Sequence, residues 1–147
     1  MKISTKGRYG LRILLDIATH QDQGPVNIRD IARRQSISGK YLWQVINPLK
    51  GAGLVRSVRG AKGGYMLARE AADISVKDVV SVLEGPVTLV PCVDTPARCK
   101  RSDNCVAREA WAEIEGKMVE TMVSIRLAEL VRRQKELDAR VAPSYVI

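Results

Sequence analysis

The sequence predicts a mainly α-helical fold with one small β-hairpin. Apolar residues recur at helical spacing through most of the 147 residues, and two short β-compatible runs around a glycine-rich segment are the exception. Hydrophobic residues make up 46% and charged residues 27% of the chain, which is typical of a packed globular protein. No apolar run approaches the roughly 18 residues of a membrane span, and the N-terminus is charged where a signal peptide would be apolar. We therefore expect a cytoplasmic protein with no membrane partner.

Two short helices joined by a tight turn are predicted in the first half of the chain, after a longer N-terminal helix that ends at Gly24-Pro25. Asn27 is a suitable N-cap for the first short helix, and Ser38 for the second. We expect the second helix to be regular only through about Asn47, because Pro48 lacks an N–H. Its residues at i, i+3, i+4 and i+7 form one apolar stripe, Leu42, Val45, Ile46 and Leu49.

A β-hairpin with a basic tip is predicted to follow. Residues 54–58 and 65–67 are β-compatible, and the connection between them contains three glycines together with Arg59 and Lys62. Two short helices and such a hairpin together form a winged helix-turn-helix. In that fold the second helix presents side chains to the major groove of DNA, and the hairpin reaches phosphates or the minor groove.

The charge distribution supports this reading. The net charge is +8, but residues 1–69 hold 13 basic and 3 acidic side chains, whereas residues 70–147 hold 11 basic and 13 acidic ones. Between Ile31 and Arg69 there are eight basic residues and no acidic one. A local basic field of this kind favours a polyanionic partner.

The second half of the sequence predicts a fourth helix, an irregular segment and a long final helix. The fourth helix begins at Ser75 with a capping box to Asp78 and ends at Gly85-Pro86. A helical pattern then runs from about residue 102 to 139, too long to be buried against so small a first domain, so we expect a homodimer through this C-terminal helix. Its apolar line is Trp111, Ile114, Met118, Met122, Ile125, Leu130 and Leu137. The predicted organisation is a winged domain over 1–85, a cysteine-bearing loop over 86–104, and a dimerisation helix with a tail over 105–147.

Three cysteines lie in the irregular segment, in the pattern Cys92-x6-Cys99-x5-Cys105. An odd number of cysteines is a poor disulfide framework, and the spacing is not the C-x-x-C of a zinc knuckle. Three thiolates on a loop suit an iron–sulfur cluster; a thiol switch, a zinc site and free surface thiols are the alternatives. The chain has one histidine, His20, which we interpret as a helix-end or surface residue, and no phosphate-binding loop, so an enzyme is not expected.

Several segments resemble the IscR/NsrR/CymR family of dimeric bacterial winged-helix regulators: 2–12, 38–44, 53–65 and 83–86. The wing pattern Arg-Gly-x-x-Gly-Gly-Tyr is the most specific of them, and the similarity covers essentially the whole chain. It implies repression of transcription at a palindromic DNA operator, with Arg59 in the minor groove. Trp43 departs from the family pattern, because many members have Glu there; base contact and packing beside the groove or the N-terminal helix are the alternatives for it. The DNA-binding residues predicted from the resemblance and the hairpin are Ser38, Lys40, Tyr41, Gln44, Arg56, Arg59 and Lys62.

The resemblance also implies a role for the cysteines, because IscR-like members with three cysteines in this loop hold an iron–sulfur cluster. Cys92, Cys99 and Cys105 are then the ligands, with a 2Fe-2S cluster favoured and a 4Fe-4S cluster as the alternative. Two-iron members have a histidine where this chain has Arg108, which leaves the fourth ligand open. The implied signal is iron–sulfur status, oxidant or NO, and the implied targets are cluster-biogenesis genes. The alternative is a thiol-redox or partner-controlled regulator of sulfur or cysteine metabolism without a cluster.

Overall fold

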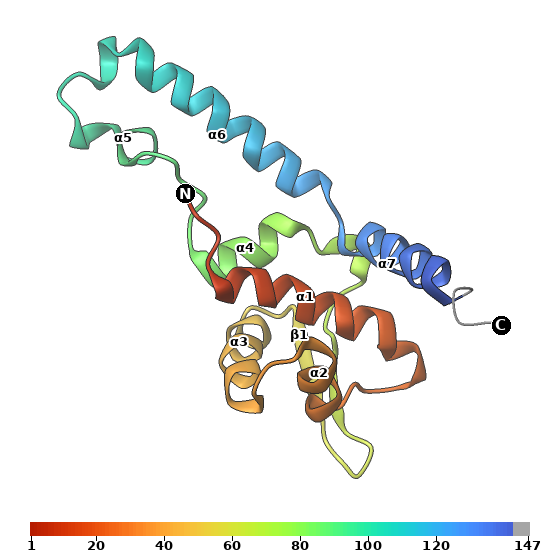
Figure 1. Ribbon diagram of the computed structural model, residues 1–147. Helices are drawn as coiled ribbons and strands as arrows, with labels where there is room; N and C mark the ends of the chain where they lie inside the picture. The colour runs from red at the N-terminus through yellow and green to blue at the C-terminus, as the bar shows by residue number, and fades with distance from the viewer. Residues whose placement is uncertain (143–147) are drawn as a thin grey trace.

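The computed structural model describes residues 1–142, which form seven α-helices and one two-stranded antiparallel sheet (Figure 1). The mainly helical fold with a small hairpin is therefore confirmed. Residues 143–147, the end of the predicted C-terminal tail, lie outside the described residues. The elements are α1 (Thr5–His20), α2 (Ile28–Gln35), α3 (Gly39–Gly51), β1 (Val55–Val58), β2 (Gly64–Leu67), α4 (Val76–Glu84), α5 (Pro91–Asp94), α6 (Val106–Ser124) and α7 (Leu127–Val141).

The core lies between α1, α3, α4 and the hairpin. The predicted stripe of α3 is confirmed, since all four of its apolar side chains are buried, together with Ile13, Leu14 and Ile17 of α1. The predicted caps are confirmed as well. Ser75 Oγ accepts from Asp78 N at 3.1 Å, and the Asp78 carboxylate accepts from Ser75 N at 2.8 Å, which completes the capping box.

Helix α3 continues past Pro48, so the expectation that it loses regularity near Asn47 was wrong. Proline removes one backbone donor, but the last turn keeps the others: Pro48 O accepts from Ala52 N at 3.0 Å and Leu49 O accepts from Leu54 N at 3.0 Å. Leu49 is fully buried in that turn. We conclude that burial of Leu49 outweighs the loss of one hydrogen bond.

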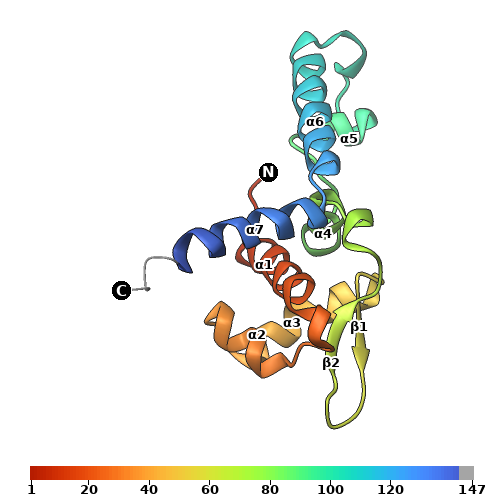
Figure 2. The same cartoon turned by 90° about the vertical axis from the view of Figure 1, so that its right-hand side faces the viewer.

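The predicted long C-terminal helix is two helices, which corrects the sequence expectation. Ile125 and Arg126 are extended, and the chain pairs there with the segment before α4: Val76 N donates to Ile125 O at 3.0 Å, and Leu127 N donates to Ile74 O at 2.8 Å. Leu127, only 1% exposed, fills the core below the break. Helix α7 then lies across α1 (Figures 1 and 2). Leu137 of the predicted apolar line is exposed.

Helix α6 projects away from the body of the molecule, with α5 beside it (Figures 1 and 2). The segment that the sequence left without periodicity consists of α5 and two short 3-10 turns, Pro96–Arg98 and Ser102–Asn104. Two hydrogen bonds attach it to α6: Leu89 N donates to Glu115 at 2.8 Å, and Arg108 Nε donates to Cys92 O at 2.8 Å. Within residues 1–142, none of the helices has the length and hydropathy needed to cross a membrane.

Candidate functional site

The exposed face of α3 carries four of the predicted DNA-binding residues. Ser38 is the N-cap, and its Oγ accepts from Tyr41 N at 3.1 Å, which orders the first turn of the helix. Lys40 and Gln44 are exposed, whereas Tyr41 is half-buried with its ring edge-on to Tyr9 at a centroid distance of 5.8 Å. The predicted role of Ser38 as N-cap is therefore confirmed.

The hairpin presents its basic residues at an ordered tip. The two strands pair in a register that places Val58 opposite Gly64, and Gly63 N donates to Gly60 O at 3.0 Å within the turn. Arg59 and Lys62 are exposed there. Arg56 is exposed further down β1, with Nη2 at 3.5 Å from the sulfur of its cross-strand partner Met66.

A backbone contact ties the hairpin to the helix-turn-helix. Val26, just before α2, exchanges two hydrogen bonds with Tyr65, at 2.9 and 2.8 Å. Gly64 permits this close approach, because a Cβ there would lie 2.4 Å from Val26 O. The hairpin therefore extends past α2 and α3 at the end of the molecule opposite α6 (Figures 1 and 2). The glycine-rich motif was visible in the sequence, but the partner that requires Gly64 was not.

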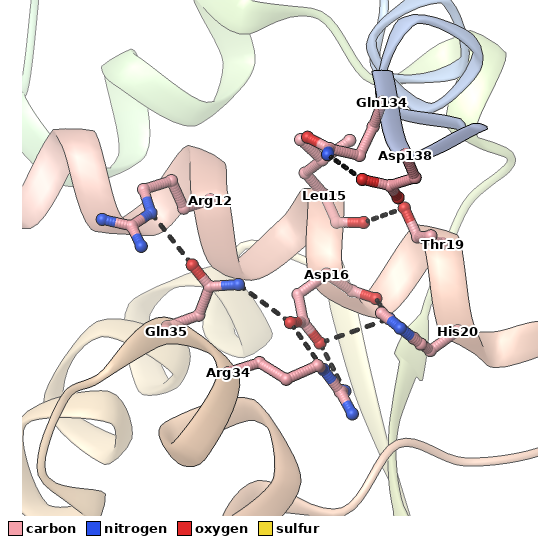
Figure 3. A pocket seen from close by; sticks show the side chains of 9 residues that line it. All are labelled: Arg12, Leu15, Asp16, Thr19, His20, Arg34, Gln35, Gln134 and Asp138. Atoms are coloured by element: carbon pink, nitrogen blue, oxygen red, sulfur yellow. Dashed lines mark hydrogen bonds and ion pairs between the residues drawn. The ribbon is translucent and has the colours of Figure 1, made fainter. Parts of the chain in front are cut away.

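A buried carboxylate connects α1 to the end of α2 (Figure 3). The Asp16 side chain, 2% exposed, accepts from Arg34 Nε and Nη2 at 2.9 and 2.7 Å, and from Gln35 Nε2 at 2.8 Å. This hydrogen bonding raises the pKa of the Arg34 guanidinium. His20, the last residue of α1, places Nδ1 2.8 Å from Asp16 O, which confirms it as a helix-end histidine. The hydrogen bonds to Asp16 therefore hold Arg34 and Gln35, the last two residues of α2 before the turn to α3.

The same network reaches α3. Gln35 Oε1 accepts from Arg12 Nε at 2.9 Å, and the Arg12 guanidinium lies 4.8 Å from the centroid of the Tyr9 ring, which in turn meets Tyr41. On the other side, Gln134 and Asp138 of α7 line the cleft above Asp16 (Figure 3). The role of Asp16 was not predicted from the sequence; its only signal is that it is the one acidic residue of α1, which otherwise carries apolar, basic and uncharged polar side chains.

The segment 83–86 at the end of α4 contacts the segment 2–12 at the start of α1. The Glu84 carboxylate accepts from Ser4 N at 2.9 Å, Ser4 Oγ at 2.5 Å and Gly7 N at 3.1 Å, all at the start of α1. The hydrogen bond from the Ser4 side chain holds the pKa of Glu84 below its ordinary value. A Cβ on Gly10 would lie 2.0 Å from the Leu83 side chain, so α4 also packs closely on α1. The cysteine segment starts immediately after this contact.

A shallow groove beside α3 adds residues that the site prediction did not include. It is lined by Lys6 of α1 and by Trp43, Asn47 and Pro48 next to Gln44. Trp43 is 54% exposed. Lys6 could have been included on the basis of the basic N-terminal segment, but its position beside α3 follows from the packing of α1.

The three cysteines are half-buried free thiols in the segment between α4 and α6. Cys105 caps α6, its Sγ accepting from Arg108 N at 3.4 Å, and the Arg108 side chain reaches the carbonyl of Cys92. Arg108 thus connects the first and third cysteines. In the part of the chain that the structure describes, the thiols do not converge into a group of three metal-ligating side chains.

These features define a winged helix-turn-helix protein: a polar helix face after a tight turn, and a basic hairpin fixed beside it. The chain belongs to the Rrf2 family, since the model of that family, described as an iron-dependent transcriptional regulator, matches residues 3–133. Regulators of this family bind DNA, so the chain is a transcriptional regulator and not an enzyme.

Named relatives agree with this assignment. The chain is 44% identical to protein rrf2 of Nitratidesulfovibrio vulgaris, with 97% of this chain and 92% of the relative aligned. It is 41% identical to CymR of Bacillus subtilis, over 88% of this chain and 89% of the relative. Among solved structures, CymR of B. subtilis, titled the global cysteine regulator, has a TM-score of 0.77 at 38% identity, covering 90% of this chain and 98% of that one. IscR of T. potens has a TM-score of 0.75 at 40% identity, covering 93% and 90%.

Proposed function

We propose that the protein is a homodimeric repressor whose binding to a palindromic operator is controlled by an iron–sulfur cluster held by Cys92, Cys99 and Cys105. The observation that carries the DNA-binding mode is the hairpin anchored to the helix-turn-helix through Val26 and Tyr65. With this anchor, α3 enters the major groove while Arg59 and Lys62 reach phosphates or the adjacent minor groove. Lys40, Tyr41 and Gln44 then face base edges or backbone, and Ser38 orders the start of the helix.

Dimerisation is proposed through α6. No residue of this helix is buried within the described single chain, and Trp111 and Ile114 are 45% and 50% exposed. These two residues, with Met118 and Met122, follow one line along the helix. Packing the line against its copy in a second chain removes apolar surface from water and places two α3 helices for two half-sites about 34 Å apart.

The donor set of the cysteine segment fits an iron–sulfur cluster in part. Three thiols in one segment supply three ligands, and Arg98, Lys100 and Arg101 beside them offset the negative charge of thiolates. The fourth ligand is not identified in residues 1–142, where Asp94, Asp103 and Glu109 remain candidates alongside a group from the second chain. When bound, a cluster supplies sensitivity to oxidant, NO and iron supply. Cluster biogenesis genes are the targets we propose, and the cytoplasm is the location.

Coupling to DNA is proposed to run through the ends of the cysteine segment. One end follows Glu84, which is bound to the start of α1; the other end is Cys105, the cap of α6. Ordering or releasing the segment therefore acts on the winged domain and on the dimer helix together. Ordering or releasing the cysteine segment is proposed to change the angle between the two α3 helices of the dimer.

A second candidate is a thiol-redox or partner-controlled regulator of sulfur or cysteine metabolism without a cluster. One observation favours it: the three thiols are half-buried and separate, as independent thiols would be. The solved structure of B. subtilis CymR, 38% identical to this chain, is titled the global cysteine regulator.

Anaerobic purification followed by a visible spectrum and counts of iron and sulfide separates the two candidates. Operator affinity is then measured on a DNA sequence selected from a random pool with the purified protein. We expect a coloured protein, and an affinity or operator choice that changes in Cys92→Ala; Thr95→Ala, an exposed residue of the same segment, is the control. A colourless protein that lacks iron supports the thiol regulator, and equal affinity of wild type and Cys92→Ala on every operator refutes the coupling.

A further inference from the structure

An exposed tryptophan lies on the DNA-facing side of α3. Trp43 is 54% exposed, although tryptophan is on average strongly buried in folded proteins. It has no role in the core, because Leu42, Val45, Ile46 and Leu49 already fill the buried side of the helix. The helical repeat places Trp43 on one side of the helix with Lys40 and Asn47, at i−3 and i+4, and Gln44 lines the same groove.

The surroundings of Trp43 indicate which partner covers it. The groove that it borders is completed by Lys6, and the chain from residue 31 to 69 contains no acidic side chain. A protein partner could bury an apolar ring without requiring a surface free of acidic side chains. DNA is a polyanion, so it does favour a surface that is basic and free of acidic side chains. The occupant to which these observations point is the major groove of a DNA duplex.

We propose that Trp43 selects thymine at one position of each operator half-site, by packing its indole against the C5-methyl group. This inference rests on the proposed operator binding and specifies its base preference. The C5-methyl of thymine is the apolar group that the major groove displays, and an indole offers apolar surface with a single N–H donor. Because the indole has no acceptor, it leaves the amino group of cytosine or adenine unpaired. Cytosine at this position is therefore disfavoured.

Removal of the methyl group alone tests this contact. Each thymine of the selected operator is replaced in turn by deoxyuridine, which keeps every hydrogen-bonding group, and affinity is measured by fluorescence anisotropy at fixed salt. For the wild type we expect one thymine per half-site at which the substitution weakens binding about fourfold, the effect of one buried methyl group. Substitution in both half-sites should weaken binding about sixteenfold.

Variants at residue 43 test whether the response to deoxyuridine depends on the indole. Trp43→Ala should bind more weakly and lose the response to deoxyuridine at that thymine, while Trp43→Phe, which keeps an apolar ring, should retain it. Gln44→Ala, which changes another residue lining the same groove, is the matched control and should also retain the response. A wild type that ignores deoxyuridine at every thymine, or a Trp43→Ala protein that still responds, overturns the inference while leaving operator binding intact. Failure of the selection to enrich any sequence overturns the proposed operator function itself, and this inference with it.

Discussion

Arg59 is an exposed cation at the tip of a hairpin whose position is fixed by backbone pairing. Because we propose that Arg59 contacts DNA as a charge, we expect Arg59→Ala to weaken operator binding and to lower the salt dependence by about one released ion. Titrations at several salt concentrations measure this slope. Lys135→Ala, an exposed cation on α7, should leave both quantities unchanged. An unchanged slope for Arg59→Ala would remove the hairpin tip from the DNA contact.

Glu84 links acid stability to the junction between α4 and α1. Its folded-state pKa is lowered from the ordinary 4.5, mainly by the hydrogen bond from the Ser4 side chain. The contribution to stability is therefore complete above pH 4.5 and is lost as the pH falls through the lower folded-state pKa. We expect Glu84→Gln to reduce the free energy of unfolding by about 1 kcal/mol at pH 7 and to flatten its decline in acid.

Urea unfolding at pH 7 and at pH 3.5 measures this difference. Glu113→Gln, which changes an exposed carboxylate of α6, should follow the wild type at both pH values. Equal loss of stability in acid for the wild type and Glu84→Gln would contradict the assignment. Asp78, whose pKa is lowered by its capping-box hydrogen bonds against the opposing effect of burial, keeps part of the acid dependence in both proteins.

At the scale of elements, the Asp16 network fixes the end of α2 against α1. Asp16→Ala leaves Arg34 and Gln35 without their shared acceptor, and we expect a loss of about 2–4 kcal/mol in unfolding free energy. Asp30→Ala is the control, because its ion pair with Arg33 at 3.3 Å is exposed and contributes under about 1 kcal/mol. Chemical unfolding of the two variants measures both. A loss no larger in Asp16→Ala than in Asp30→Ala would show that the network does not hold α2.

The hairpin and α2 are joined at Gly64, where the sheet edge meets the Val26 backbone. Adding a Cβ 2.4 Å from Val26 O forces this backbone pairing apart, so Gly64→Ala should cost about 2 kcal/mol and weaken operator binding. Gly116→Ala, in the middle of α6 with open space around it, should instead stabilise by about 0.5–1 kcal/mol. Thermal unfolding measures the stability of both variants, and an operator titration measures their DNA affinity. Unchanged stability of Gly64→Ala would refute the close approach of residue 64 to the Val26 backbone.

In a single chain, the arm formed by α6 and α5 exposes apolar side chains of α6 to water. Ile114 is half-exposed on the apolar line of α6, so Ile114→Glu should leave the winged domain folded but shift the protein from dimer to monomer. Sedimentation velocity measures the mass, and circular dichroism checks the fold. Val106→Glu, exposed but away from that line, should remain dimeric. A wild type that sediments as a monomer would refute dimerisation through α6.

The basic and the slightly acidic halves of the sequence occupy different parts of the molecule. The entire basic excess belongs to residues 1–69, which form α1–α3 and the hairpin, at the end opposite the α6 arm (Figure 1). Residues 70–147, with a slight acidic excess, form the helices through which we propose that two copies meet. Two strongly basic surfaces would repel each other there, so this charge distribution is compatible with the proposed dimerisation beside a DNA-binding half.

The elements whose signals are local could be predicted from the amino-acid sequence. The stripe of α3, the caps Asn27, Ser38 and Ser75, and the basic hairpin tip all follow from residue type and spacing, because hydrogen bonds and side-chain periodicity within one turn or one hairpin produce them. The face of α3 that carries Lys40 and Gln44 was predictable for the same reason. Cysteine spacing likewise indicated a common site without showing whether the thiols meet.

The features that depend on distant partners could be recognised only in the folded chain. The break at Ile125-Arg126 contains neither glycine nor proline; it exists because the backbone pairs with Ile74 and Val76 and because Leu127 is buried. Asp16, Gly64 and Glu84 acquire their roles from residues up to 80 positions away. No local pattern encodes such contacts, since their free energy arises when packing brings the partners together and excludes water between them.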